Sequence, residues 1–133
     1  MKLRRNDRDL GNRGQELVEF ALVAPLLMLL TLAVIESGVV ILSYNTISSA
    51  AREGVRVGAI RSATEADVRA TVMDRAQALD EAALAVPVTM GGAGDTVRVQ
   101  VTYDAHLVSG AMVQAVGGNP VIRLRTTATM LRE

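Results

Sequence analysis

The chain changes its hydrophobic period along its length. Residues 20–42 are almost continuously apolar, and apolar positions then recur every three or four residues up to residue 58. From residue 86 onward, apolar and polar residues alternate. The first pattern predicts one long helix, and the second predicts strands with one buried face.

The apolar stretch is long enough to cross a membrane. As a helix, residues 20–42 span roughly 34 Å, against about 30 Å for the hydrocarbon core of a bilayer. Pro25 removes one hydrogen bond and should loosen the first turns. Glu36 lies roughly 24 Å beyond Phe20, so we expect its carboxylate to reach headgroups or water at the far interface.

The helical period continues beyond the membrane stretch to about residue 61. Ala50, Gly54 and Gly58 form a row of small residues that lets a second surface approach closely. The row is interpreted equally well as a packing stripe for neighbouring subunits or as a groove for the chain's own C-terminal part.

A second, amphipathic helix is predicted over residues 62–80. Ser62 and Thr64 are candidate N-caps. Its apolar face follows a helical period, and acidic residues occupy its first turn, where the helix dipole favours them. The apolar positions are Val68, Val72, Ala76 and Leu79.

Three alternating segments predict three antiparallel strands, within residues 86–90, 97–103 and 122–130. "GGAGD" at 91–95 fits a hairpin loop, and "GGNP" at 117–120 fits a turn. Pro87 places the first strand at an edge, and residues 105–116 hold a short helix or an irregular connection. The predicted fold class is α+β: a long N-terminal transmembrane helix, then a small domain with one helix on a three-stranded antiparallel sheet. The expected parts are a leader (1–14), the long helix (15–61) and an exported domain (62–133).

Charge divides the chain at the start of the long helix. Fourteen basic and fourteen acidic residues balance overall, but residues 1–14 carry a net charge of plus three and the remainder minus three. A basic head before an apolar segment predicts a cytoplasmic N-terminus in a single-pass membrane protein.

Glu19 is a carboxylate at the start of the membrane stretch and is costly there. A cut between Gly14 and Gln15 would place a new α-amino group one helical turn away on the same face. The charged amine and the carboxylate would lower each other's cost. The amine of an adjacent subunit could serve instead, which would fix the register of a helical bundle.

The residues around this site resemble a known family. A basic leader ending in Gly14, then "QELVEF" and a long apolar helix, resembles the processing site of type IV-like prepilins. "GQELVEFALVAPLLMLL", "AAREGVRVG" at 50–58 and the terminal "TTATMLRE" look like TadE-like minor pseudopilins of bacterial tight-adherence (Flp) pilus systems. Glutamine follows the glycine here, where small residues are also common in the family.

The resemblance implies a structural part of a tight-adherence pilus. It implies that a prepilin peptidase cuts after Gly14 and that Gln15 becomes the first residue, which can then be N-methylated. It also implies that Glu19 and Phe20 take part in assembly. The implied partners are that peptidase, the major Flp pilin, other minor pseudopilins, membrane lipid, and the inner-membrane assembly platform with its ATPase. The implied place is the bacterial cytoplasmic membrane, with the C-terminal domain periplasmic or extracellular, or within the pilus fibre.

Two other interpretations of the apolar helix stay open. In the first, the helix is an uncut signal anchor. The alternative function is then that of a periplasmic binding or adhesion module tethered to the membrane. A secretory signal peptide would be cut after "SSA" at 48–50, but the apolar run is long for one and Glu36 interrupts it.

The composition argues against an enzyme and against cofactors. The chain has no cysteine and one histidine, His106, which leaves neither a usual zinc ligand set nor a catalytic triad. The glycines at 91–94 lack the lysine and helix of a phosphate-binding loop. With neither a basic stripe nor stacking aromatics, nucleic-acid binding is not expected.

Overall fold

The long helix predicted from the apolar period is the first element of the structure. The computed structural model describes residues 7–92 and 94–133, so residues 1–6 of the predicted leader and Ala93 of the predicted hairpin loop lie outside the described residues. Helix α1 runs from Asp7 to Gly58 and contains Pro25. Its part from Gly14 onward is long and apolar enough to span a membrane, and the most apolar window there has a mean hydropathy of 2.5.

Contacts group the chain into two compact units, residues 1–35 and 36–133. In the first unit, the side chains from Gly14 onward are exposed or half-buried, including large apolar ones. The second unit holds all the remaining elements and the last turns of α1. The division of the chain into leader, long helix and exported domain stays a prediction.

The second unit contains short helices and one antiparallel sheet. Its helices are α2 (Glu65–Arg75), the 3₁₀ helix η1 (Glu81–Ala83) and α3 (Gly110–Ala115). Its strands are β1 (Leu84–Ala85), β2 (Val88–Met90), β3 (Thr96–His106) and β4 (Val121–Leu131). The predicted α+β class, with a long helix before a small helix-and-sheet domain, is confirmed.

The sheet has four strands instead of the predicted three, because the first strand is interrupted at Pro87. Strands β1 and β2 pair with the same partner in one unbroken register, from Leu84 opposite Tyr103 to Met90 opposite Val97. Proline has no N–H to donate, but the carbonyl of Pro87 accepts a hydrogen bond from the N–H of Gln100 at 3.1 Å. The interrupted strand pairs only with β3 among the described strands, so the predicted edge position is confirmed.

The central strand β3 is longer than predicted. It pairs with β4 over the full length of both, from Thr96 opposite Leu131 to His106 opposite Val121. Near one end, Arg123 Nε donates to Asp104 Oδ1 across the two strands at 2.7 Å. That hydrogen bond is the largest cause of the lowered pKa of the Asp104 carboxyl. The pairing therefore extends past the alternation at Val97–Tyr103 that predicted it.

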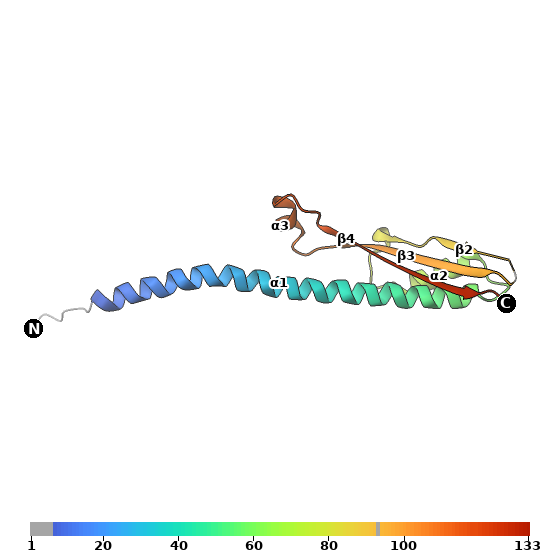
Figure 1. Cartoon of the computed structure of the whole chain (residues 1–133), viewed down its shortest axis with the longest axis horizontal. Coiled ribbons are helices and arrows are strands. Elements are labelled where there is room, and N and C mark those ends of the chain that lie inside the picture. The colour runs from blue at the N-terminus through green and yellow to red at the C-terminus, as the bar shows by residue number, and fades with distance from the viewer. Residues whose placement is uncertain (1–6, 93) are drawn as a thin grey trace, which may run out of the picture. The chain divides into compact units, whose positions relative to one another are not determined.

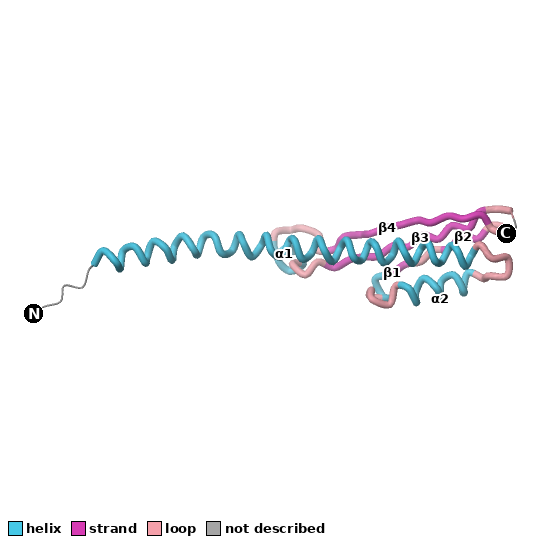
Figure 2. Tube along the Cα trace, turned by 90° about the horizontal axis from the view of Figure 1, so that it is seen from below, coloured by secondary structure: helices cyan, strands magenta, loops and turns pink. Residues whose placement is uncertain are grey.

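The core lies between one face of the sheet and two helices. Figures 1 and 2 show the C-terminal part of α1 and helix α2 side by side along the strands. The opposite face of β3 is exposed or half-buried at Arg98, Gln100 and Thr102, as is common for antiparallel sheets. The buried apolar side chains are Ile47, Ala50, Ala51, Val55, Val68, Val72, Ala76, Val86, Val97, Val99 and Val101.

Helix α2 is shorter than the predicted span of residues 62–80. Thr64, and not Ser62, is the N-cap. The helix ends at Arg75, and Asp80 instead caps η1 by accepting from the N–H of Ala82 at 3.0 Å. The predicted apolar face is nevertheless confirmed, since Val68, Val72 and Ala76 are buried and Leu79 packs against them.

Acid should weaken the start of α2 through its capping box. Asp67 accepts from the backbone N–H and the hydroxyl of Thr64, and these two bonds, in that order, lower the pKa of its carboxyl. A depressed pKa stabilises the fold above the ordinary value of about 3.9 and loses that effect as pH falls through the folded value. We expect Asp67→Asn to flatten the loss of stability below about pH 4, measured by denaturant unfolding at a series of pH values. An unchanged pH slope would show that Asp67 does not contribute.

Candidate functional site

The predicted processing site lies in the first unit, on the exposed surface of α1. Gly14 and Gln15 are helical, and their side-chain positions are exposed. A Cβ built on Gly14 meets nothing within 4 Å, so packing within the chain does not require glycine here.

Glu19 and Phe20 also lie on α1 with exposed side chains, and Phe20 is 69% exposed. Glu19 lies four residues after Gln15 in the same helix, the spacing that places two side chains on one face. The predicted pairing of the Gln15 amine with the Glu19 carboxylate rests on this spacing.

The predicted small-residue row packs inside the second unit. Ala50 is fully buried. A Cβ on Gly54 would lie 2.5 Å from Val72 Cγ2, and a Cβ on Gly58 would lie 2.8 Å from Val97 Cγ1. The row thus meets α2 and β3 of the same chain, which is the intramolecular one of its two interpretations.

Glu36 has a partner that sequence reasoning missed. Its Oε2 accepts from Ser109 Oγ at 2.9 Å, and its Oε1 accepts from the N–H of Ser109. Ser109 is the N-cap of α3 and makes no capping bond with its own side chain. An acid inside an apolar run signals the need for a partner, but no pattern points to a serine 73 residues away.

A second missed residue is Arg132, which joins two loops. Its guanidinium donates to the carbonyls of Gly91 at 2.8 Å, Arg61 at 2.9 Å and Ala63 at 3.3 Å. The connection between α1 and α2 is thereby tied to the loop between β2 and β3. The alternation of residues 122–130 ends just before Arg132 and gives no hint of this role.

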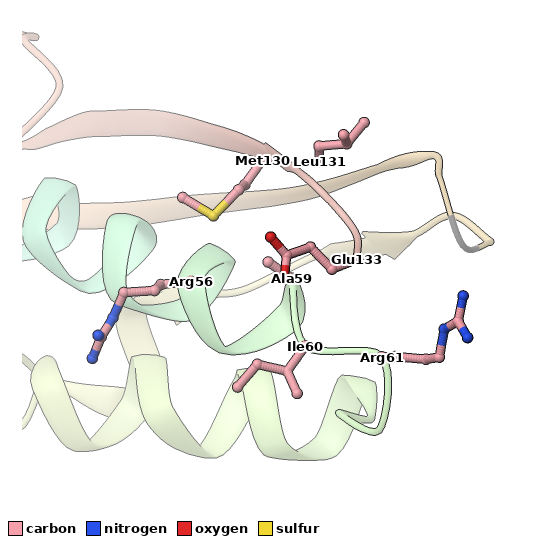
Figure 3. Close-up of a pocket in the computed structure, with 7 residues that line it drawn as sticks. All are labelled: Arg56, Ala59, Ile60, Arg61, Met130, Leu131 and Glu133. Carbon is pink, nitrogen blue, oxygen red and sulfur yellow. The ribbon is translucent and has the colours of Figure 1, made fainter.

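The pocket drawn in Figure 3 lies where α1 and β4 end. It is lined by Arg56, Ala59, Ile60, Arg61, Met130, Leu131 and Glu133. The side chains of Arg56 and Arg61 point away from each other (Figure 3), and Arg56 Nη2 is bonded to Glu53 Oε1 at 2.7 Å. The two cations therefore do not converge on a ligand.

The described residues also offer no metal centre. They contain no cluster of three or more histidine or acidic side chains placed to hold a metal ion. His106 lies at the end of β3 and is exposed. The features that remain are the exposed start of α1 and the part of the second unit around Glu36 and α3.

The comparison with protein families covers most of helix α1. Residues 14–56 match the family model of TadE-like proteins, so the matched segment begins at Gly14 and includes Glu19, Glu36 and Gly54. No curated protein and no solved structure matches the chain. The match confirms the predicted resemblance over residues 14–56 and supports a pilin-like, structural protein associated with a tight-adherence (Tad) pilus system.

Proposed function

We propose that this TadE-like chain is a minor pseudopilin that is cut between Gly14 and Gln15 and then assembled through its N-terminal helix. The observation that carries the proposal is the placement of Glu19 on α1. It lies one turn after Gln15 on an exposed helix of membrane-spanning length. The matched family segment also starts at the glycine before the proposed cut.

The benefit of the proposed cut to the membrane helix is electrostatic. Cleavage creates an α-amino group that is largely charged at neutral pH, within reach of a carboxylate at the i+4 position. Each charge is expensive alone in or near hydrocarbon, and the pair costs less than the two separate charges. In a fibre, Glu19 would meet the amine of its own chain or that of a neighbour.

The proposed partners follow from this role. A prepilin peptidase of the cytoplasmic membrane makes the cut. The major Flp pilin and other minor pseudopilins supply the neighbouring helices, and the inner-membrane platform inserts the subunit. The net positive charge of residues 1–14 supports a cytoplasmic leader and a C-terminal domain on the other side of the membrane.

The test is the identity of the N-terminal residue in cells that carry a working pilus apparatus. Mass spectrometry of the membrane-extracted protein should find Gln15 first, with or without a methyl group. Met1 would overturn the proposal in favour of an uncut, tethered module, and Ala51 would overturn it in favour of a secretory signal peptide.

A matched pair of glycine variants makes the test specific. Gly14→Leu should abolish the cut, because the peptidase reads the residue before the scissile bond. Gly11→Leu adds the same side chain three residues earlier and should leave cleavage intact. Equal processing of both variants would show that Gly14 is not recognised.

A further inference from the structure

The segment around α3 is unusual in composition. Residues 107–122, which join β3 to β4 and begin the latter, carry no charged side chain, although charged residues make up 21% of the chain. A connection between strands is normally polar, because it lies in water. The composition of this connection thus indicates that its surroundings are not water alone.

The apolar side chains of this segment are exposed on one face. Val108 is 71% exposed, Met112 54% and Val116 85%, and Ala111 and Ala115 are also exposed. These five positions follow the spacing i, i+3, i+4, i+7 and i+8. Ala111, Met112 and Ala115 lie within α3, and Val108 and Val116 flank it. The chain therefore presents an apolar face here, which we call the α3 face.

The bonds from Ser109 to Glu36 locate the α3 face along α1. Ser109 immediately precedes α3, and both oxygens of Glu36 accept hydrogen bonds from it. Figure 1 shows α3 beyond the end of the sheet farthest from the C-terminus. The α3 face is thus held at the level of Glu36, which interrupts the apolar stretch of residues 20–42.

The length of the membrane span indicates how deep Glu36 lies in the bilayer. A carboxylate is costly in hydrocarbon, so α1 crosses most cheaply with Glu36 at the outer boundary. The uncharged stretch between Glu19 and Glu36 is residues 20–35, roughly 24 Å long as a helix, so the span that excludes both carboxylates ends at Ile35. Val39, Ile41 and Leu42, the next large exposed apolar side chains of α1, then lie in the headgroup layer, within about two helical turns of Glu36.

We propose that the α3 face inserts into the outer interface of the bilayer and holds the folded domain against the membrane. The occupant is lipid because the face is uncharged, apolar and fixed at the level where α1 leaves the hydrocarbon. Exposed apolar surface of this kind marks contact with a membrane or a protein, and the bond to Glu36 favours the membrane. The proposal rests on α1 spanning a bilayer and not on cleavage of the leader.

The chain contains no cysteine, so single-cysteine variants of the full chain take one fluorophore each. Met112→Cys and Val116→Cys, reconstituted in phosphatidylcholine vesicles and labelled with an environment-sensitive dye, should be quenched by lipids brominated near the headgroup. Gln114→Cys lies on the opposite side of α3 and should be quenched less. Arg69→Cys, exposed on α2, should be unaffected.

A label at Leu27→Cys reports separately on the span. If Leu27 is quenched by deeply brominated lipids while positions 112 and 116 behave like position 69, the α3 face lies in water and the proposal is overturned. Disulfide-linked dimers through position 112, without lipid quenching, would overturn it in favour of a second copy. An unquenched Leu27 would remove its premise, whichever N-terminus mass spectrometry finds.

The role of Glu36 is tested by two substitutions in the Met112→Cys background. Glu36→Ala removes both acceptors and should reduce the quenching at position 112. Glu36→Gln retains one oxygen for the N–H of Ser109 and should preserve more of it. If both variants were quenched as strongly as the Met112→Cys parent, Glu36 would not set the depth of α3.

Discussion

Gly54→Leu is expected to lower the free energy of unfolding of residues 36–133 by about 3 kcal/mol or more. Even a single Cβ on Gly54 would lie 2.5 Å from Val72 Cγ2 and 3.5 Å from Val99 Cγ1. Valine is branched at Cβ and cannot swing its methyl groups aside freely. The loss is a large share of the roughly 5–15 kcal/mol that holds a typical domain together. Pulse proteolysis of the detergent-solubilised full chain in urea measures it.

Two further variants separate the clash from the effect of glycine itself. Gly54→Ala gains about 1 kcal/mol of helix propensity and should still be destabilised. Gly38→Ala makes the same change at a position of α1 where a Cβ meets nothing within 4 Å, so it should be neutral or slightly stabilising. A Gly54→Ala protein as stable as the Gly38→Ala protein would refute the close packing.

A double-mutant cycle identifies the partner. Val72→Ala removes the methyl group nearest to Gly54 and by itself leaves a cavity. In the Gly54→Ala background it should cost less, because the new methyl group fills part of that cavity. Additive effects would mean that Gly54 and Val72 do not meet.

Glu19→Ala is expected to abolish incorporation of the subunit into pili while leaving it in the membrane. The variant keeps the apolar stretch of α1 and the positively charged leader, so insertion should be unchanged. It loses the carboxylate that would pair with the proposed Gln15 amine, leaving that cation without its partner in hydrocarbon. Co-purification with the major pilin and counts of pili per cell measure the effect.

Glu16→Ala is the matched control. Glu16 is also an exposed acid at the start of α1, but it directly follows the proposed first residue and cannot take the i+4 position. Its loss should leave assembly near that of the unaltered protein. Normal piliation in Glu19→Ala cells, or an equal defect in both variants, would exclude a specific role for Glu19.

Periodicity predicted the elements whose two faces have different surroundings. The alternation around Val97, Val99 and Val101 predicted β3 because each of these residues points into the core. The edge position of the first strand followed from Pro87. The ends of elements were less accurate, since Asp80 fits a helix end as well as the cap of η1 that it forms.

Contacts between residues far apart in the chain could not be predicted from the sequence. The row of Ala50, Gly54 and Gly58 predicted that another surface packs closely against α1. The row itself fits a neighbouring subunit as well as the chain's own α2 and β3, which pack there in the structure. The carboxylate of Glu36 was expected to reach headgroups or water, whereas the structure gives it Ser109. A local pattern specifies which face of a helix is apolar or small, and the fold decides what meets it.

The contribution of α1 to the core limits how the chain can be shortened into a water-soluble fragment. A fragment starting at residue 62 would lack Ile47, Ala50, Ala51 and Val55, all buried against α2 and the sheet. Its valines on β3 would then face water, and aggregation would follow. A fragment that starts near residue 43 keeps these side chains of α1 in the core and loses only the hydrogen bonds between Glu36 and Ser109 among the contacts described above. It is therefore the better fragment for crystallisation.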